Sequence, residues 1–114
     1  MASVKNLGIG HCNIEGGLAT NLAKTTEIKN VIFREQIDIF GINETNLNPE
    51  IKTDSLNIPL NYKLKRCDIP NSGSRGGYYG MLISKKLKYK VVTVNNTDIS
   101  KIEALWIELS DLNI

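Results

Sequence analysis

The sequence predicts one domain of the mixed α/β (α+β) class, with a single early helix and a strand-rich remainder. Three observations predict it. Apolar and polar residues alternate over Leu7–Asn13, apolar residues recur at helical spacing between Thr25 and Gln36, and Ile37–Asn43 is a mostly apolar run. A strand–helix–strand unit of this length builds a parallel or mixed sheet, so we expect the two strands to be neighbours and the second to be buried.

The remaining elements follow from alternation and from breaker residues. Proline, asparagine and glycine predict long loops over Asn46–Asn61 and Ile69–Gly77. A basic turn, Lys85–Lys88, is expected to join two strands into a hairpin. The expected strands are Tyr62–Arg66, Tyr78–Ser84, Tyr89–Val94 and Ile102–Leu109.

Composition restricts the class of protein. The chain has 114 residues, of which 41% are hydrophobic and 23% charged, which excludes a disordered or fibrous protein. No run approaches the roughly 18 apolar residues of a membrane span, and the N-terminus has no apolar signal segment. We therefore expect an intracellular protein, nuclear or cytoplasmic, that is not secreted and has no membrane partner. Cys12 and Cys67 are expected to be free thiols, and their spacing fits no zinc motif.

Polar residues follow both strands of the predicted unit at matching places. Asn13 and Glu15 come just after the first strand, and Asn43 and Glu44 come just after the second. The carboxyl ends of neighbouring parallel strands are favoured site positions, so the two glutamates are candidates to converge on one pocket. Carboxylate and amide oxygens suit Mg²⁺ or Mn²⁺ rather than zinc. The alternative is that both glutamates are solvated loop residues.

The order of four motifs resembles a known family. Asn13–Gly17 and Ile39–Thr45 are similar to the first two motifs of the endonuclease/exonuclease/phosphatase superfamily. Ser74–Gly77, running into Met81–Lys85, and then Ile102–Leu109 are similar to the branch found in non-LTR retrotransposons. The likeness extends over nearly the whole chain.

This resemblance implies a DNase I-like fold, in which two sheets pack face to face, and a Mg²⁺-dependent (or Mn²⁺-dependent) phosphodiesterase that nicks DNA. Glu44 would be the metal ligand, Asn13 would position the metal or the scissile phosphate, and Glu15 would be a second acid near the metal. Residues 1–114 would be the N-terminal half of the domain. The Asp-x-Asn and Asp-His motifs that complete the catalytic set, and a reverse transcriptase, would follow. We therefore expect these residues to be inactive alone.

Basic residues concentrate in the middle third of the chain. Arg75, Lys65 and Arg66 are candidates for contacts to the phosphate backbone of DNA, Arg75 foremost because it lies beside flexible glycines. Lysines that keep solvated strand edges from aggregating would give the same pattern.

Other residues and functions stay open. His11 is interpreted as a strand residue, Trp106 as a core residue, Cys12 as buried and inert, and Asp68 as a residue that caps a turn. A rival function within the superfamily is hydrolysis of a phospholipid or an inositol phosphate. A rival from another class is a non-catalytic binding module or the relic of a decayed element.

Overall fold

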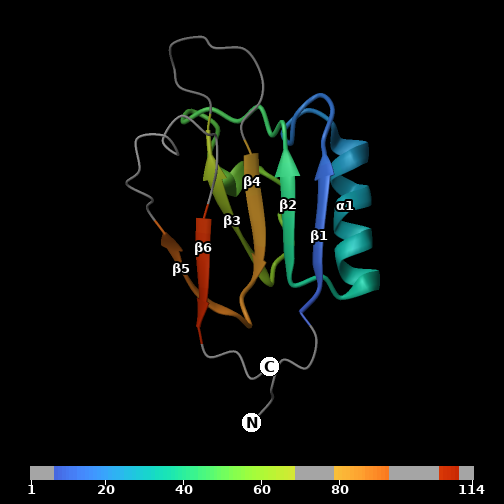
Figure 1. Ribbon diagram of the computed structural model, residues 1–114. Coiled ribbons are helices and arrows are strands. Elements are labelled where there is room, and N and C mark those ends of the chain that lie inside the picture. The colour runs from blue at the N-terminus through green and yellow to red at the C-terminus, as the bar shows by residue number, and fades with distance from the viewer. Residues whose placement is uncertain (1–6, 69–78, 93–105, 111–114) are drawn as a thin grey trace.

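The computed structural model describes residues 7–68, 79–92 and 106–110. Within these ranges one α-helix and two sheets form a mixed α/β fold (Figure 1), as expected from the sequence. The predicted loop at 69–77 and the first part of the last predicted strand lie outside the described residues. The elements are β1 (Ile9–Asn13), α1 (Leu22–Glu35), β2 (Ile39–Asn43), the 3-10 helix η1 (Thr53–Ser55), β3 (Tyr62–Cys67), β4 (Tyr79–Ser84), β5 (Lys88–Val92) and β6 (Trp106–Ser110).

The larger sheet has four strands in the order β1-β2-β4-β3. β1 and β2 run parallel with Ile9 opposite Ile39, which confirms that the predicted strand–helix–strand unit forms neighbouring strands. β4 runs antiparallel to both β2 and β3. The carboxyl ends of β1, β2 and β3 therefore meet at the same edge of the sheet.

Helix α1 begins three residues earlier than the spacing of its apolar residues predicts. Asn21 caps it, because the side-chain Oδ1 of Asn21 accepts a hydrogen bond from Lys24 N at 3.2 Å. The helix ends at Glu35. Its C-cap residue Gln36 has a left-handed backbone (φ 52°), and the next amide, Ile37 N, donates to Ile32 O at 3.0 Å. The buried face of the helix carries Thr25, Ile28 and Ile32.

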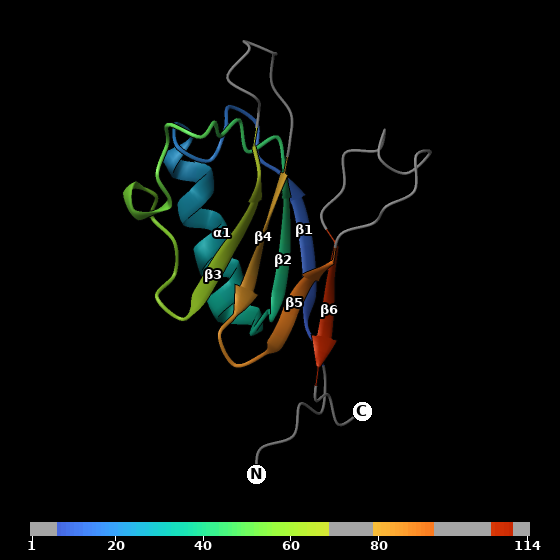
Figure 2. The same cartoon turned by 90° about the vertical axis from the view of Figure 1, so that its left-hand side faces the viewer.

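Helix α1 lies on one face of the four-stranded sheet, and β5 and β6 lie on the other (Figure 2). An apolar cluster fills the space on each side. On one face α1 packs through Ile28 and Ile32 against Phe40, Ile42 and Leu82. On the other face β5 and β6 lie against the sheet, and Ile39, Ile83 and Leu87 form the buried part of that cluster. β2 is buried on both faces, as its apolar sequence predicts.

The predicted hairpin of Tyr78–Ser84 with Tyr89–Val94 is wrong. β4 pairs with β2 on one side and with β3 on the other, so both of its hydrogen-bonding edges are filled. A turn at Lys85–Lys86 takes the chain away from the four-stranded sheet, and β5 pairs with β6, placing Val91 opposite Ile107. The basic turn exists, but it connects two sheets rather than two paired strands.

Tyr62 gives the fold a pH dependence in the alkaline range. Its hydroxyl donates a hydrogen bond to Ile37 O, which ties β3 to the segment before β2. Burial raises the pKa of Tyr62, and the nearby Asp38 carboxylate raises it further. Because the folded-state pKa lies above the unfolded one, the neutral hydroxyl stabilises the fold fully below about pH 10, and this contribution is lost as pH rises through the folded-state pKa.

We therefore expect the free energy of unfolding to fall more steeply above about pH 10 in the wild type than in Tyr62→Phe. Urea unfolding at several pH values measures it. Burial also raises the pKa of Cys12, but it does so equally in the wild type and in Tyr62→Phe. The difference in pH dependence between the two proteins therefore reports Tyr62 alone. Parallel pH profiles would contradict the assignment.

Candidate functional site

Polar residues from neighbouring strands lie in one row at the edge of the four-stranded sheet. The strand register places Asn13 opposite Asn43, Asn43 opposite Tyr79, and Tyr79 opposite Cys67. Glu15 and Glu44 follow Asn13 and Asn43 in the chain. We call Asn13, Glu15, Asn43 and Glu44 the site edge. All four are exposed to solvent.

Backbone contacts hold together the two loops that follow β1 and β2. Ile14 N donates to Asn43 O at 3.1 Å, and Leu18 N donates to Thr45 O at 2.9 Å. Gly17 has a positive φ of 90°, and a Cβ atom there would lie 3.1 Å from Cβ of Asn46. Glycine therefore permits both the turn and the close approach of the loops. The loops that carry Glu15 and Glu44 are fixed beside each other.

The backbone at Glu44 and the side chain of Thr45 are both unusual. Glu44 adopts the left-handed conformation with φ 57°, which is uncommon for a residue with a side chain. Thr45 is 1% exposed, and its Oγ1 has no hydrogen-bond partner among the described residues. Costly conformations and unsatisfied buried polar groups gather at functional sites more often than elsewhere. Both observations mark the end of β2 as a functional candidate.

The side chains at the site edge carry the type of donor atom that magnesium takes. Mg²⁺ is held in proteins by one or two carboxylates and keeps several water molecules, and Glu44 and Glu15 with the Asn13 amide offer such oxygen donors. No group of three or more His, Cys, Asp and Glu side chains in the described ranges is placed to hold a metal. These residues do not form a closed site of four protein ligands, which is the arrangement typical of structural zinc.

His11 and Cys12 lie on opposite faces of β1. His11 is a strand residue, as predicted, and is exposed on the face that carries Asn13, where a Cβ atom on Gly41 would lie 3.0 Å from its Cδ2. Cys12 packs against the helix-side cluster and is only half-buried, less than predicted. Desolvation raises the pKa of Cys12, with a smaller opposing effect of Lys24, so the thiol stays neutral and is a poor nucleophile.

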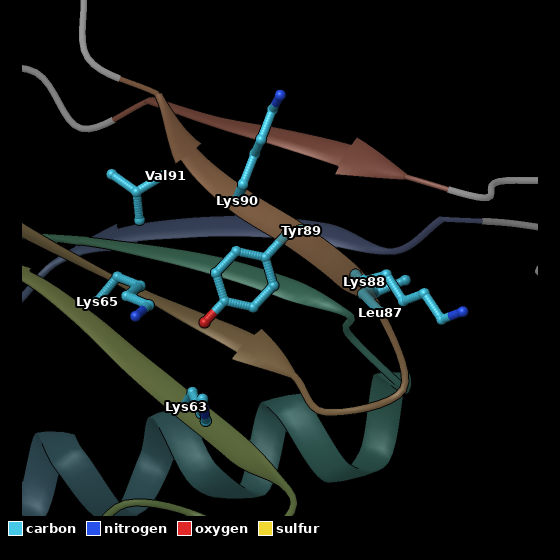
Figure 3. A pocket seen from close by; sticks show the side chains of 7 residues that line it. All are labelled: Lys63, Lys65, Leu87, Lys88, Tyr89, Lys90 and Val91. Carbon is cyan, nitrogen blue, oxygen red and sulfur yellow. The ribbon is translucent and has the colours of Figure 1, made fainter.

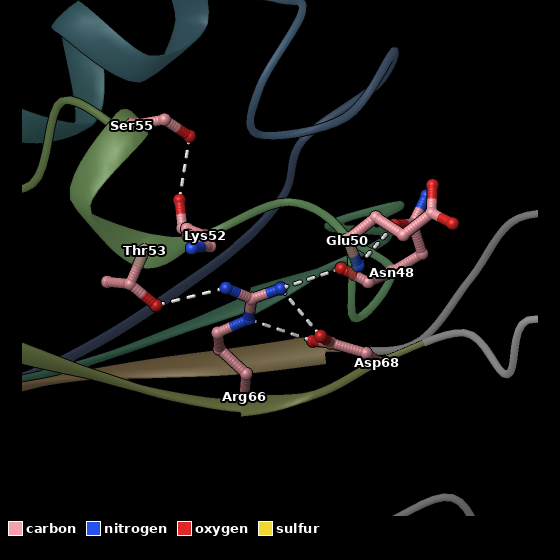
Figure 4. A network of polar contacts seen from close by, with 7 residues as sticks. All are labelled: Asn48, Glu50, Lys52, Thr53, Ser55, Arg66 and Asp68. Carbon is pink, nitrogen blue, oxygen red and sulfur yellow. Dashed lines mark hydrogen bonds and ion pairs between the residues drawn. The ribbon is translucent and has the colours of Figure 1, made fainter.

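Arg66 is bound within the chain (Figure 4). Its Nε and Nη2 donate to the two carboxylate oxygens of Asp68 at 3.0 and 2.6 Å, Nη2 also donates to Asn48 O at 3.0 Å, and Nη1 donates to Thr53 Oγ1 at 3.0 Å. The side chain is 14% exposed. This network ties the loop after β2 to the end of β3. It gives Arg66 and Asp68 an ion pair that the sequence did not predict, where a phosphate contact was expected for Arg66 and a turn cap for Asp68.

The other predicted phosphate contacts fall in different places. Lys65 lies on the sheet face opposite α1, with its Nζ 5.7 Å from the ring centre of Tyr89. Arg75 and the side chain of Trp106 lie outside the described residues. Sequence reasoning missed Tyr79 and Cys67 as members of the row at the sheet edge, because the partners of β4 were predicted wrongly.

The fold and the site edge define a mixed α/β domain with oxygen donors at the carboxyl ends of parallel strands. Comparison with protein-family models, with curated proteins and with solved structures gives no match. No helix in the described part of the chain is long and apolar enough to span a lipid bilayer.

Proposed function

We propose that the chain is part of a divalent-metal-dependent phosphodiesterase that acts on DNA, of the kind its sequence resembles. One observation carries the proposal: the parallel register of β1 and β2 sets Asn13 beside Asn43, directly before Glu44. Two sequence motifs separated by about thirty residues thus supply oxygen donors to one sheet edge. The left-handed backbone of Glu44 and the unsatisfied hydroxyl of Thr45 at the same place support it.

In this proposal the Glu44 carboxylate and the Asn13 amide hold Mg²⁺ or Mn²⁺, with Glu15 as a second carboxylate. When bound, the ion polarises a phosphoryl oxygen and stabilises the negative charge that develops during displacement. The protein residues contribute orientation. Gly17 and the backbone bonds between the two loops keep the loops that carry Glu15 and Glu44 beside each other without the ion.

The proposed activity of these residues alone is metal binding without cleavage. The resemblance places the water-orienting Asp-x-Asn motif and the Asp-His pair after position 114, and His11 is the single histidine of the sequence. His11 lies within β1 and precedes the site edge, so it does not replace that pair. The DNase I-like fold and the retrotransposon branch belong to the same proposal.

Metal affinity of the intact chain tests the proposal. We expect Glu44→Gln to weaken binding of Mn²⁺ at least about tenfold, equal to about 1.4 kcal/mol, because it removes a charged ligand and keeps the shape of the side chain. Titration calorimetry measures the affinity, and paramagnetic broadening of the Asn13 and Asn43 side-chain amide signals locates the ion.

Glu27→Gln is the matched control, because Glu27 is exposed on α1 and the change in charge is the same. It should leave the affinity for Mn²⁺ unchanged. Equal affinities of the wild type and Glu44→Gln would contradict the proposal and favour a non-catalytic binding module. Mg²⁺-dependent nicking of plasmid DNA by the purified chain, lost in Glu44→Gln, would contradict the expected inactivity while supporting the metal site.

A further inference from the structure

A basic groove lies between the edge strand β3 of the larger sheet and β5 of the smaller one (Figure 3). Its volume is about 420 Å³, and none of the residues that line it is acidic. The whole chain has a net charge of only +2, so the lysines at this groove are a local concentration. Lys63 and Lys65 face the groove, whereas Lys88 and Lys90 lie on the face of β5 opposite Tyr89 (Figure 3). The groove is lined by Lys63, Lys65, Leu87, Lys88, Tyr89, Lys90 and Val91.

The alternation of side chains along β3 and β5 explains which residues face the groove. Leu64 packs into the helix-side cluster, so Lys63 and Lys65 project from the opposite face of β3, toward the smaller sheet. Tyr89 packs into the cluster between the two sheets, and Val91 projects to the same side of β5. Protection of an edge strand from aggregation requires exposed lysines but does not require that they face a groove. Lys63 and Lys65 line one.

The groove combines cationic groups with an apolar floor. Lys65 Nζ lies 5.7 Å from the ring centre of Tyr89, a distance at which an ammonium and an aromatic ring attract each other. Lys90 pairs with Glu108 at 3.1 Å, but both side chains are exposed, so this pair contributes little and is easily exchanged. Positive charge that follows a backbone, next to an aromatic ring and an exposed aliphatic side chain, is the chemistry that binds single-stranded nucleic acid.

The groove also leads toward the site edge. Lys65 precedes Cys67 by two residues on the same face of β3, and Cys67 shares its row with Asn43. Two residues of a strand span about 7 Å, and β3 and β2 are separated by two strand spacings, about 10 Å. The groove side of Lys65 and the site edge thus lie on the same face of one sheet, separated by these two short steps.

We propose that this groove binds the backbone of single-stranded nucleic acid, with phosphates on Lys63 and Lys65 and a base or sugar on Tyr89. The link between this groove and DNA cleavage rests on the proposed function. The groove adds one feature to the proposed substrate, an unpaired strand beside the site edge. A polymer, rather than a lone inositol phosphate, is the ligand that uses both the groove and the site edge.

Fluorescence anisotropy with a labelled oligothymidylate tests this on the full chain in EDTA, where no metal is bound. We expect the double variant Lys63→Gln/Lys65→Gln to weaken binding at least about tenfold and to lower the salt slope by about 1.4, which is two phosphate contacts. Tyr89→Leu should weaken binding roughly fivefold, and Tyr89→Phe should keep it.

The double variant Lys29→Gln/Lys52→Gln changes the net charge equally but lies on α1 and beside η1, away from the groove. It should keep most of the affinity. Equal losses in the two double variants, tighter binding of a duplex, or equal competition by an acidic polypeptide would overturn the proposal. Failure here is separable from failure of the metal site, because oligonucleotide binding is measured in EDTA without metal, and the groove variants should bind Mn²⁺ like the wild type.

Discussion

Replacing Ile42 with alanine should destabilise the chain by about 2–5 kcal/mol. Ile42 lies in the central strand β2, is 0% exposed, and packs against the residues of the cluster beneath α1. The change removes buried methyl and methylene groups and leaves a cavity, because β2 is held on both sides by β1 and β4 and has little room to move. A loss of this size is a large part of the 5–15 kcal/mol that stabilises an ordinary domain.

Urea unfolding followed by circular dichroism measures the effect, and two variants calibrate it. Ile42→Val should cost about 0.5–1.5 kcal/mol. Ile9→Ala makes the same chemical change on the neighbouring strand, where Ile9 is 67% exposed, and should change stability by less than about 0.5 kcal/mol. If Ile42→Ala and Ile9→Ala cost the same, the cluster beneath α1 is not a packed core.

Replacing Arg66 with alanine should cost about 2–3 kcal/mol. The change leaves the Asp68 carboxylate, 18% exposed, without its bidentate partner, and it removes the donors that Thr53 Oγ1 and Asn48 O accept from. Breaking a fully buried pair costs about 3–5 kcal/mol, and the partial exposure of this pair reduces that figure. Arg66→Lys should recover little, because an ammonium does not reproduce the planar fork of the guanidinium.

A double-mutant cycle with Asp68→Asn isolates the pair from the other contacts of Arg66. Arg34→Ala is the control, because the Arg34 side chain is 68% exposed and its Nε lies 3.8 Å from Oε1 of Glu35. Loss of this exposed pair should change stability by less than about 0.5 kcal/mol. A cost of Arg66→Ala no greater than that of Arg34→Ala would show that the network seen in Figure 4 does not hold the loop in solution.

Local pattern predicted the strand–helix–strand unit, because its signals lie within each segment. The apolar run of β2 and the spacing of Ile28 and Ile32 are such signals. The start of α1 was missed because the first turn carries an exposed Leu22 and no apolar periodicity. The predicted pairing of β4 with β5 was wrong. Two strands joined by a short turn have the sequence pattern of a hairpin, and that pattern does not reveal whether other strands, here β2 and β3, already occupy both edges of the first strand. Which strands pair with each other is decided by the packing of the whole fold.

The candidate site was predictable in part for the same reason. Asn13 ends β1, and Glu15 and Glu44 follow β1 and β2. The parallel register that brings these strand ends together comes with a strand–helix–strand unit. Arg66 looked like an exposed strand cation, since its partners Thr53 and Asn48 lie 13 and 18 residues away in an irregular loop. The basic groove arises from the placement of one sheet on another, which no local pattern of residues specifies.

The left-handed backbone at Glu44 has a consequence for how this sequence changes over generations. Glycine and asparagine adopt that conformation at lower cost than glutamate does, by about 1–2 kcal/mol for a residue of ordinary shape. Selection for stability alone would therefore replace Glu44. In related sequences, a glutamate kept at this position would indicate a need for its carboxylate, whereas glycine or asparagine there would count against the proposed metal site.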